Sequence, residues 1–138
     1  MWNMTKHELH TGRTVVSSSA PWEAQIGYSR ALRVGNLIFV AGTVAADEQG
    51  APVGTTAAQQ TDYILRKISS ALEKAGGSLR DVVRVDAFLV NFADFDGYAD
   101  VHRRHFGEIR PVNTTVQCAA LVTSAFLVEI SALAVVGE

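Results

Sequence analysis

The chain has 138 residues, the length of one domain by the usual size of about 100–200 residues. Hydrophobic residues make up 48% and charged residues 19%, a globular balance that excludes a disordered or linker protein. The net charge is −2, so the chain has no excess of basic side chains to bind phosphates, and we do not expect a nucleic acid partner.

Residues 1–20 predict an N-terminal strand and connector. The mixed segments 6–11 and 13–16 are typical of a weak strand. The run Ser17-Ser18-Ser19-Ala20-Pro21 predicts a flexible connector by its composition.

Two strands joined by a tight turn are predicted next. Side chains alternate along Tyr28–Val34, and Gly35-Asn36 favours a hairpin turn. Leu37–Ala46 then begins with almost no polar residue, which predicts a strand covered on both faces. Because one layer of helices covers only one face, the other face needs a partner, most simply another subunit.

Two helices are predicted in the middle of the chain. The apolar residues of the first recur with helical spacing and form one stripe: Ile64, Leu65, Ile68, Ala71, Leu72 and Ala75. Thr56 and Gln59 fit a capping box before it, and Gly76-Gly77 fits its end. Asp94 is a candidate N-cap for the second helix, which Gly107 ends.

Three further strands complete the predicted fold. They are Val82–Phe92, Thr114–Leu121 and Phe126–Val136, and in the first of them alternation places on one face Val83, Val85, Ala87 and Leu89. The order of strands, helix, strand, helix and strands predicts a mixed sheet with both helices on one face. We therefore expect an α+β fold in a single domain spanning residues 1–138.

The composition also bears on the compartment. The single cysteine, Cys118, cannot form an internal disulfide, so the fold does not depend on oxidising conditions. No apolar run reaches the roughly 18–20 residues of a membrane helix. Residues 1–13 lack the apolar stretch of a signal peptide. We expect a cytoplasmic protein without a membrane partner.

The common catalytic motifs are missing from the sequence. It contains no phosphate-binding loop, no GxGxxG fingerprint after a strand and no GxSxG elbow. The pairs His7/His10 and His102/His105 have metal-ligand spacing, but neither has an obvious third ligand. We therefore expect no metal site.

Glu129 is the unusual residue of the last predicted strand, because its neighbours are almost all apolar. A buried carboxylate is costly unless it is paired or hydrogen-bonded, and its raised pKa suits a general base or a group that orients water. The alternative is a glutamate on the exposed edge of the strand. The residues alone favour neither interpretation.

Other polar residues are weaker candidates. Asn113, Thr114 and Thr115 at the entry to a strand can orient a small polar ligand, although such a trio more often serves turn chemistry. Tyr28 begins another strand, where half-buried packing is the commoner role. Cys118 lies within a strand and is more often inert packing than a nucleophile.

Five blocks carry a resemblance to a known family: Gly27-Tyr28-Ser29, Val34–Gly42, the helix Gln60–Gly77, Val83–Phe95, and Arg110-Pro111 leading to Val128-Glu129-Ile130. In this order and spacing they resemble the Rid (RidA/YjgF) family over about residues 26–136. The resemblance implies a chorismate-mutase-like α+β domain that forms homotrimers with small-molecule clefts between subunits. It also implies hydrolysis of enamine or imine intermediates such as 2-aminoacrylate to 2-keto acids and ammonia, without a cofactor.

The resemblance assigns roles to particular residues. It implies that Tyr28 lies in the cleft, that Glu129 stands near the attacking water, and that Gly42 contributes its backbone. Thr115 falls where many members carry cysteine. His102 falls among cleft-lining positions, where it supplies a group that titrates near neutral pH.

Asn113 is a departure from the family pattern. Deaminating members have an arginine at this position, which clamps the substrate carboxylate. A charge-assisted arginine fork cannot be replaced by an amide. We therefore expect a neutral imine, enamine or related C–N substrate rather than 2-aminoacrylate. The alternative is a non-catalytic protein that binds a small metabolite on the same trimeric scaffold.

Overall fold

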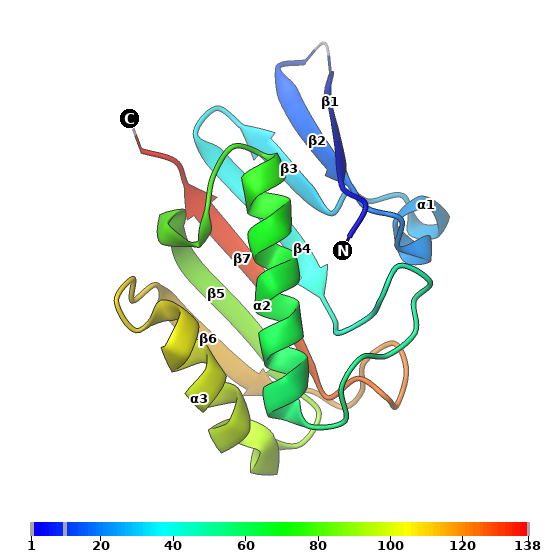
Figure 1. Ribbon diagram of the computed structural model, residues 1–138, viewed down its shortest axis with the longest axis vertical. Coiled ribbons are helices and arrows are strands. Elements are labelled where there is room, and N and C mark those ends of the chain that lie inside the picture. Colours follow the sequence, from blue (N-terminus) through cyan, green and yellow to red (C-terminus); the bar gives the residue numbers. More distant parts are fainter. Residues whose placement is uncertain (1, 10, 138) are drawn as a thin grey trace.

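The computed structural model describes residues 2–9 and 11–137, which form a seven-stranded sheet and three α-helices (Figure 1). The elements in chain order are β1 (Thr5–Leu9), β2 (Arg13–Ser17), α1 (Pro21–Ile26), β3 (Ala31–Val34), β4 (Leu37–Thr43), α2 (Ala57–Lys74), η1 (Leu79–Asp81), β5 (Val82–Leu89), η2 (Phe92–Asp94), α3 (Phe95–Phe106), β6 (Val112–Gln117) and β7 (Val128–Val135). The strands lie in the order β1-β2-β3-β4-β7-β5-β6. The pair β5–β6 is parallel and the other neighbours are antiparallel. The predicted α+β fold with a mixed sheet is confirmed.

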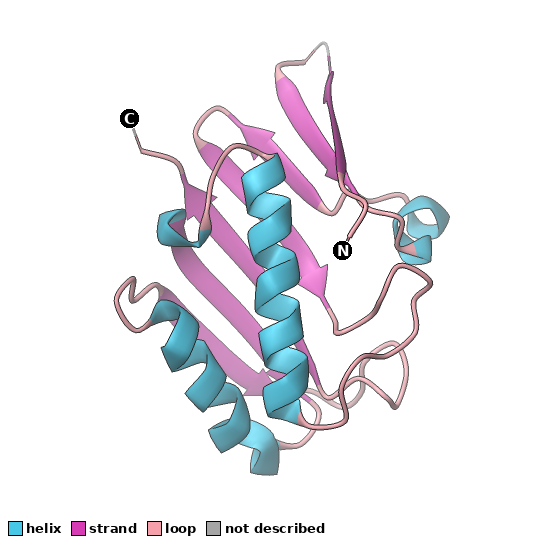
Figure 2. Cartoon of the chain, viewed as in Figure 1, coloured by secondary structure: helices cyan, strands magenta, loops and turns pink. Residues whose placement is uncertain are grey.

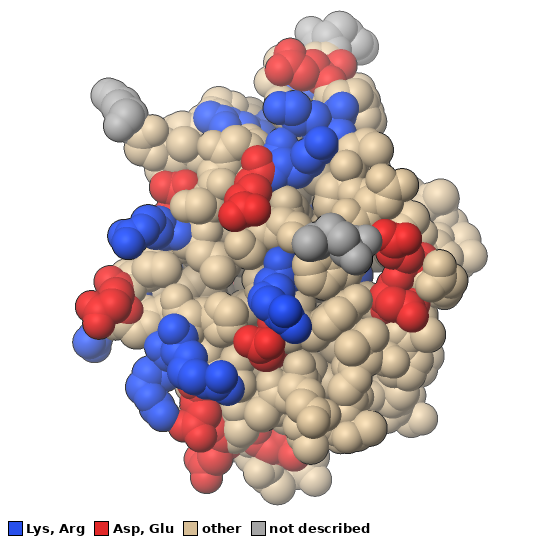
Figure 3. Space-filling model, in the orientation of Figure 1, with Lys and Arg blue, Asp and Glu red and all other residues tan. Residues whose placement is uncertain are grey.

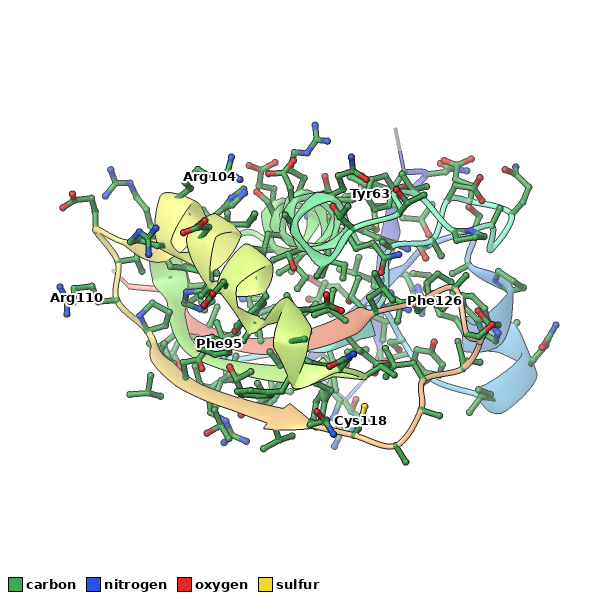
Figure 4. All side chains as sticks on the ribbon, turned by 90° about the horizontal axis from the view of Figure 1, so that it is seen from below. Tyr63, Phe95, Arg104, Arg110, Cys118 and Phe126 are labelled. Carbon is green, nitrogen blue, oxygen red and sulfur yellow. The ribbon has the colours of Figure 1, made fainter. Side chains whose placement is uncertain are left out.

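The helices α2 and α3 cover one face of this sheet (Figure 4). The apolar stripe of α2 is buried as predicted, and it packs against sheet residues such as Ile38, Val85 and Ile130. The capping box is also confirmed, because the Gln59 amide donates to Thr56 Oγ1 at 3.1 Å. Burial of this stripe, at about 25 cal/mol per Å² of apolar area, is the main force that joins the two layers.

The opposite face of the sheet carries no helix. Along β7 the residues Val128, Ile130, Ala132 and Ala134 are buried under the helices, whereas Glu129 and its alternate neighbours point to the open face and are half-buried. Phe39 on β4 remains 45% exposed and Val116 on β6 remains 42% exposed. The same face also carries the Arg84–Asp86 ion pair of β5, and large apolar side chains exposed on an uncovered sheet face are typical of an association surface.

The start of the chain differs from prediction. A six-residue helix, α1, begins at Pro21, directly after the predicted connector. Such a helix is too short for a hydrophobic period, but proline favours a first helical turn. Gly27, with a φ of 91°, ends α1, and β3 begins only at Ala31, so Tyr28 lies before the strand rather than in it. Residue 10 lies outside the described residues, and with it part of the predicted strand 6–11 and of the pair His7/His10.

The remaining strands are shorter than predicted, and one register is wrong. A bulge between Val82 and Arg84 turns Val83 outward to 41% exposure, so it does not share a face with Val85, Ala87 and Leu89. The strand β6 ends at Gln117 because its partner β5 ends at Leu89.

The cap of α3 also differs. Asp94 stands at the N-cap position of α3 but makes no capping bond with its side chain. Asn91 instead caps the preceding turn η2 by accepting from the Ala93 amide at 2.9 Å. The polar residue that starts this helical region is therefore three positions earlier than predicted.

Two long loops meet at one end of the sheet (Figure 2). The fully buried Gln60 joins them, because its Nε2 donates to the carbonyls of Gly54 at 3.1 Å and Ala125 at 2.9 Å. Its Oε1 accepts from the Leu127 amide at 2.8 Å. The two loops that this side chain joins also carry Val44 and Val122, which line the cavity described below. Among the described residues, no helix is long and apolar enough to cross a bilayer.

Candidate functional site

A small cavity of about 120 Å³ lies near the start of β3 and the end of β4. It brings together three residues that the sequence singled out: Tyr28, Gly42 and Glu129. Arg30 and Lys67 also line it. Its remaining walls are mostly apolar: Ala20, Trp22, Ile26, Val44 and Val122. A concave, mostly apolar pocket with a few convergent polar groups is typical of a small-molecule site.

Glu129 is half-buried on a central strand, so the interpretation as an exposed edge residue is wrong. Among the described residues, no group donates a hydrogen bond to the Glu129 carboxylate. Burial raises the pKa of Glu129 above its ordinary value, and the nearby Arg30 charge opposes this shift. The carboxylate is therefore available to a ligand or to water in the cavity.

Gly42 supports Glu129 by lacking a side chain. The ladder between β4 and β7 is irregular between Val40 and Thr43, which places two residues of β4, Ala41 and Gly42, opposite one residue of β7. The position that a Cβ on Gly42 would take is occupied by Oε2 of Glu129. The bulge and the glycine together leave room for the carboxylate.

A buried ion pair that the sequence did not reveal organises this end of the sheet. Arg30 is 3% exposed, and its Nε donates to Glu23 Oε2 at 3.1 Å. Its Nη1 donates to the Gly42 carbonyl and to Thr43 Oγ1, each at 3.0 Å. Its Nη2 donates to the Tyr28 hydroxyl at 3.3 Å. One guanidinium thus ties α1, β4 and Tyr28 together.

Glu23 is itself fixed by the connector before α1. The Ser18 amide donates to Glu23 Oε1 at 2.9 Å, and the Ser18 hydroxyl donates to Oε2. The charge of Arg30 is therefore matched within the wall of the cavity. No spacing in the sequence pointed to this pair, because Glu23 lies in α1, a helix that was not predicted, and Arg30 lies just before β3.

Lys67 is the second functional candidate that sequence reasoning missed. It is 3% exposed, and its Nζ donates to the Ala46 carbonyl at 3.1 Å. Burial, together with the Arg30 charge, lowers the pKa of Lys67 to about 8. A signal was present, because Lys67 falls three residues after Ile64 and so lies on the apolar stripe of α2.

The other predicted site residues form a separate polar cluster on β6 and α3. Asn113 Nδ2 donates to the Tyr98 hydroxyl at 2.8 Å and lies 3.2 Å from His102 Nε2. Thr115 Oγ1 donates to Asn113 Oδ1 at 2.7 Å and lies 3.2 Å from the Tyr98 hydroxyl. Burial lowers the pKa of His102, and the nearby His105 acts in the same direction.

The two groups of residues lie on opposite faces of the sheet in one chain. Asn113 and Thr115 pair in register with Val85 and Ala87, which are buried under the helices. Glu129 pairs instead with Phe88, on the open face. The structure therefore brings together Tyr28, Gly42 and Glu129, but it does not bring Asn113, Thr115 or His102 to them.

The histidine pair of α3 divides between two partners. His105 Nε2 lies 2.9 Å from Asp62 Oδ1 on α2, whereas His102 contacts Asn113. Within residues 2–9 and 11–137, no three His, Cys, Asp or Glu side chains gather as a metal ion would require.

Comparisons with known proteins agree with this architecture. The family model described as Endoribonuclease L-PSP matches residues 17–136. The chain is 39% identical over 108 residues to a RutC family protein of Pyrococcus abyssi, covering 78% of this chain and 84% of that protein. It is 36% identical over 108 residues to the 3-aminoacrylate deaminase RutC of Acinetobacter baylyi, covering 78% of this chain and 85% of that protein. A crystal structure of a Mycobacterium tuberculosis member of the YjgF/YER057c/UK114 family matches with a TM-score of 0.83 at 42% identity, over 90% of this chain and 99% of that chain.

We predict that Glu23→Ala lowers the free energy of unfolding by about 3–5 kcal/mol, because it leaves the Arg30 charge buried and unpaired. The measurement is urea unfolding at a fixed protein concentration. Asp100→Ala is the matched control, since it breaks an exposed pair with Arg103 that contributes at most about 1 kcal/mol. Equal losses in the two variants would contradict a special role for Glu23.

We predict that Gly42→Ala destabilises the protein by displacing the Glu129 carboxylate. Glu129→Ala in the same chain should relieve most of this cost, because the clash is with that side chain. A double-mutant cycle by urea unfolding measures the coupling, which we expect to be about 0.5–3 kcal/mol. Strictly additive effects would show that Gly42 does not make room for Glu129.

Proposed function

The chain belongs to the Endoribonuclease L-PSP family, the YjgF/RidA/RutC group, and from this membership we propose that it hydrolyses a small imine, enamine or related C–N compound. The observation that carries the proposal is the half-buried Glu129 carboxylate, which faces a small cavity and accepts no hydrogen bond from the described residues. The relative named 3-aminoacrylate deaminase supports the reaction class.

In the proposed reaction Glu129 accepts a proton from water as the water oxygen adds to the imine carbon. Protonation of the nitrogen then lets ammonia leave and a carbonyl product form. The Tyr28 hydroxyl, held by Arg30, orients the substrate. No metal or organic cofactor takes part in this proposal.

The size of the cavity limits the substrate. Its volume of about 120 Å³ is below the roughly 300–1,000 Å³ of a typical small-molecule pocket. A compound of a few non-hydrogen atoms fits one chain's share of the site. Larger parts of a substrate would need room that another subunit provides.

We propose that the complete site lies between subunits of a homotrimer. The Asn113 cluster and the Glu129 cavity lie on opposite faces of one chain, so joining them in one cleft requires two copies. The apolar open face, with Phe39 and Val116 exposed, supports such an assembly. Asn113 would then offer an uncharged amide to the substrate, which favours a neutral group over a carboxylate.

A polyanionic substrate fits this chain less well, although the matching family model bears the name of an endoribonuclease. The net charge is −2, and basic and acidic side chains stand close together over α2 and α3 (Figure 3). Two exposed arginines there are paired with carboxylates of the same helix, Arg66 with Asp62 at 3.3 Å and Arg103 with Asp100. A salt-dependent affinity for RNA would be needed to support nucleic acid binding.

We predict that Glu129→Gln lowers turnover of imine and enamine substrates by about 100-fold or more, the usual contribution of a general base. Glu73→Gln, which changes an exposed carboxylate on α2, is the control. The wild-type rate should fall as the pH drops through the raised pKa of Glu129, because a protonated carboxyl cannot accept the proton. Full activity of Glu129→Gln would refute the assignment.

The same assay separates the substrate classes. The panel contains imines and enamines with and without a carboxylate, and Asn113→Arg is tested beside the wild type. Gain of 2-aminoacrylate hydrolysis in this variant would show that the rest of the machinery is present. A compound that raises the melting temperature but is not consumed would instead favour the non-catalytic binding protein.

We predict that the protein sediments as a trimer and that Phe39→Glu shifts it toward monomer, because the substitution puts a charge on the open apolar face. Arg66→Glu, on the outer side of α2, is the control and should leave the trimer intact. Analytical ultracentrifugation over a range of concentrations makes the comparison. A wild-type protein that remains a stable monomer would exclude the proposed assembly.

A further inference from the structure

Lys67 is an unusual residue in the wall of the cavity. Lysine side chains are almost never fully buried unless they are paired, yet Lys67 is 3% exposed. Among residues 2–9 and 11–137, no carboxylate oxygen lies within 4.0 Å of Lys67 Nζ, so the amine has no ion-pair partner there. Its hydrogen bond to the Ala46 carbonyl at 3.1 Å leaves further capacity on the amine.

The other cation of the cavity is already committed. Arg30 makes four hydrogen bonds, to Glu23, Gly42, Thr43 and Tyr28, so its role in the wall is structural. Lys67 has no comparable structural role, because one backbone carbonyl is its only partner in the described chain. It lines the same cavity as Glu129, and its position on α2 is flanked by the buried Ile64 and Ile68.

We propose that the Lys67 amine is a covalent nucleophile of this site, which captures small imine and carbonyl compounds as a Schiff base. The inference rests on the proposed function and adds a step to it. The Nζ lone pair attacks the imine carbon and forms a new C–N bond. Protons of Nζ pass to the original nitrogen, the bond from carbon to that nitrogen breaks, and ammonia leaves. Water then adds to the Schiff-base carbon while Glu129 accepts its proton. Glu129 returns this proton to Nζ, the bond between carbon and Nζ breaks, and the hydroxyl loses its proton, so a carbonyl product leaves and both the amine and the carboxylate are restored.

The surroundings of Lys67 favour the neutral amine that this step needs. A desolvated lysine beside a second cation is a known way of activating this nucleophile. Burial and the Arg30 charge lower the pKa to about 8, against the opposing charges of Glu23 and Asp47. About a tenth of the amine is then neutral at pH 7, compared with less than about a thousandth for an ordinary lysine.

The test uses reductive trapping on the whole protein. Propionaldehyde, a neutral compound small enough for the cavity, is added with sodium cyanoborohydride near neutral pH, and the propylated residues are located by peptide mass spectrometry. The chain has three lysines, so Lys6 and Lys74, both exposed, serve as internal controls. We expect Lys67 to be labelled at least 10-fold faster than either. Labelling of Lys67 no faster than Lys6 and Lys74 would overturn the proposal.

Variants separate this inference from the proposed function. Lys67→Arg keeps the charge but removes the nucleophile, and Lys67→Met keeps the length of the side chain. Both should lose imine hydrolysis while keeping the wild-type circular dichroism spectrum. Hydrolysis at the wild-type rate in either variant would overturn the Schiff base, yet leave water attack through Glu129 standing. A wild type that labels at Lys67 but hydrolyses no imine would refute the proposed function alone.

Discussion

The arrangement of the cavity depends on the burial of one guanidinium. Arg30 can stay out of water only if its donors are satisfied and its charge is matched. Glu23 supplies the charge, and Gly42, Thr43 and Tyr28 supply acceptors. These requirements fix α1 against the sheet, hold the bulge in β4 and place the Tyr28 hydroxyl. The ion pair therefore acts less as a source of stability than as a device that specifies one geometry.

Two ionisable groups of the cavity, Glu129 and Lys67, have pKa values that the same surroundings shift in opposite directions. Burial raises the pKa of Glu129 and lowers the pKa of Lys67, so both are pushed toward their uncharged forms. Arg30 opposes the shift of Glu129 and adds to that of Lys67. A carboxyl group with a raised pKa beside an amine with a lowered pKa suits chemistry at carbon–nitrogen double bonds, because protons are transferred at each step of that chemistry.

The candidate site residues are divided between the two faces of the sheet, which bears on why one face is left without a helix. A chain that carried both groups on one face could complete a site alone. Here Glu129 lies on the open face and Asn113 lies under α3 at the edge strand β6. The proposed assembly therefore has two supports, the exposed apolar surface and the incomplete site.

Local chemistry in the sequence was enough to predict α2, the hairpin turn at Gly35-Asn36, the mixed sheet with two helices on one face, and Glu129 as an unusual carboxylate. Helical spacing, capping residues and glycine turns act between near neighbours, so they can be read along the chain. Only the tertiary structure decided that Glu129, Gly42 and Tyr28 share a cavity with Lys67, that Asn113 does not, and that Val83 is turned outward by a bulge. These features depend on strand register and on contacts between separate parts of the fold, such as Glu23 with Arg30. Such contacts produce no periodic pattern in the sequence, so they could not be predicted from it.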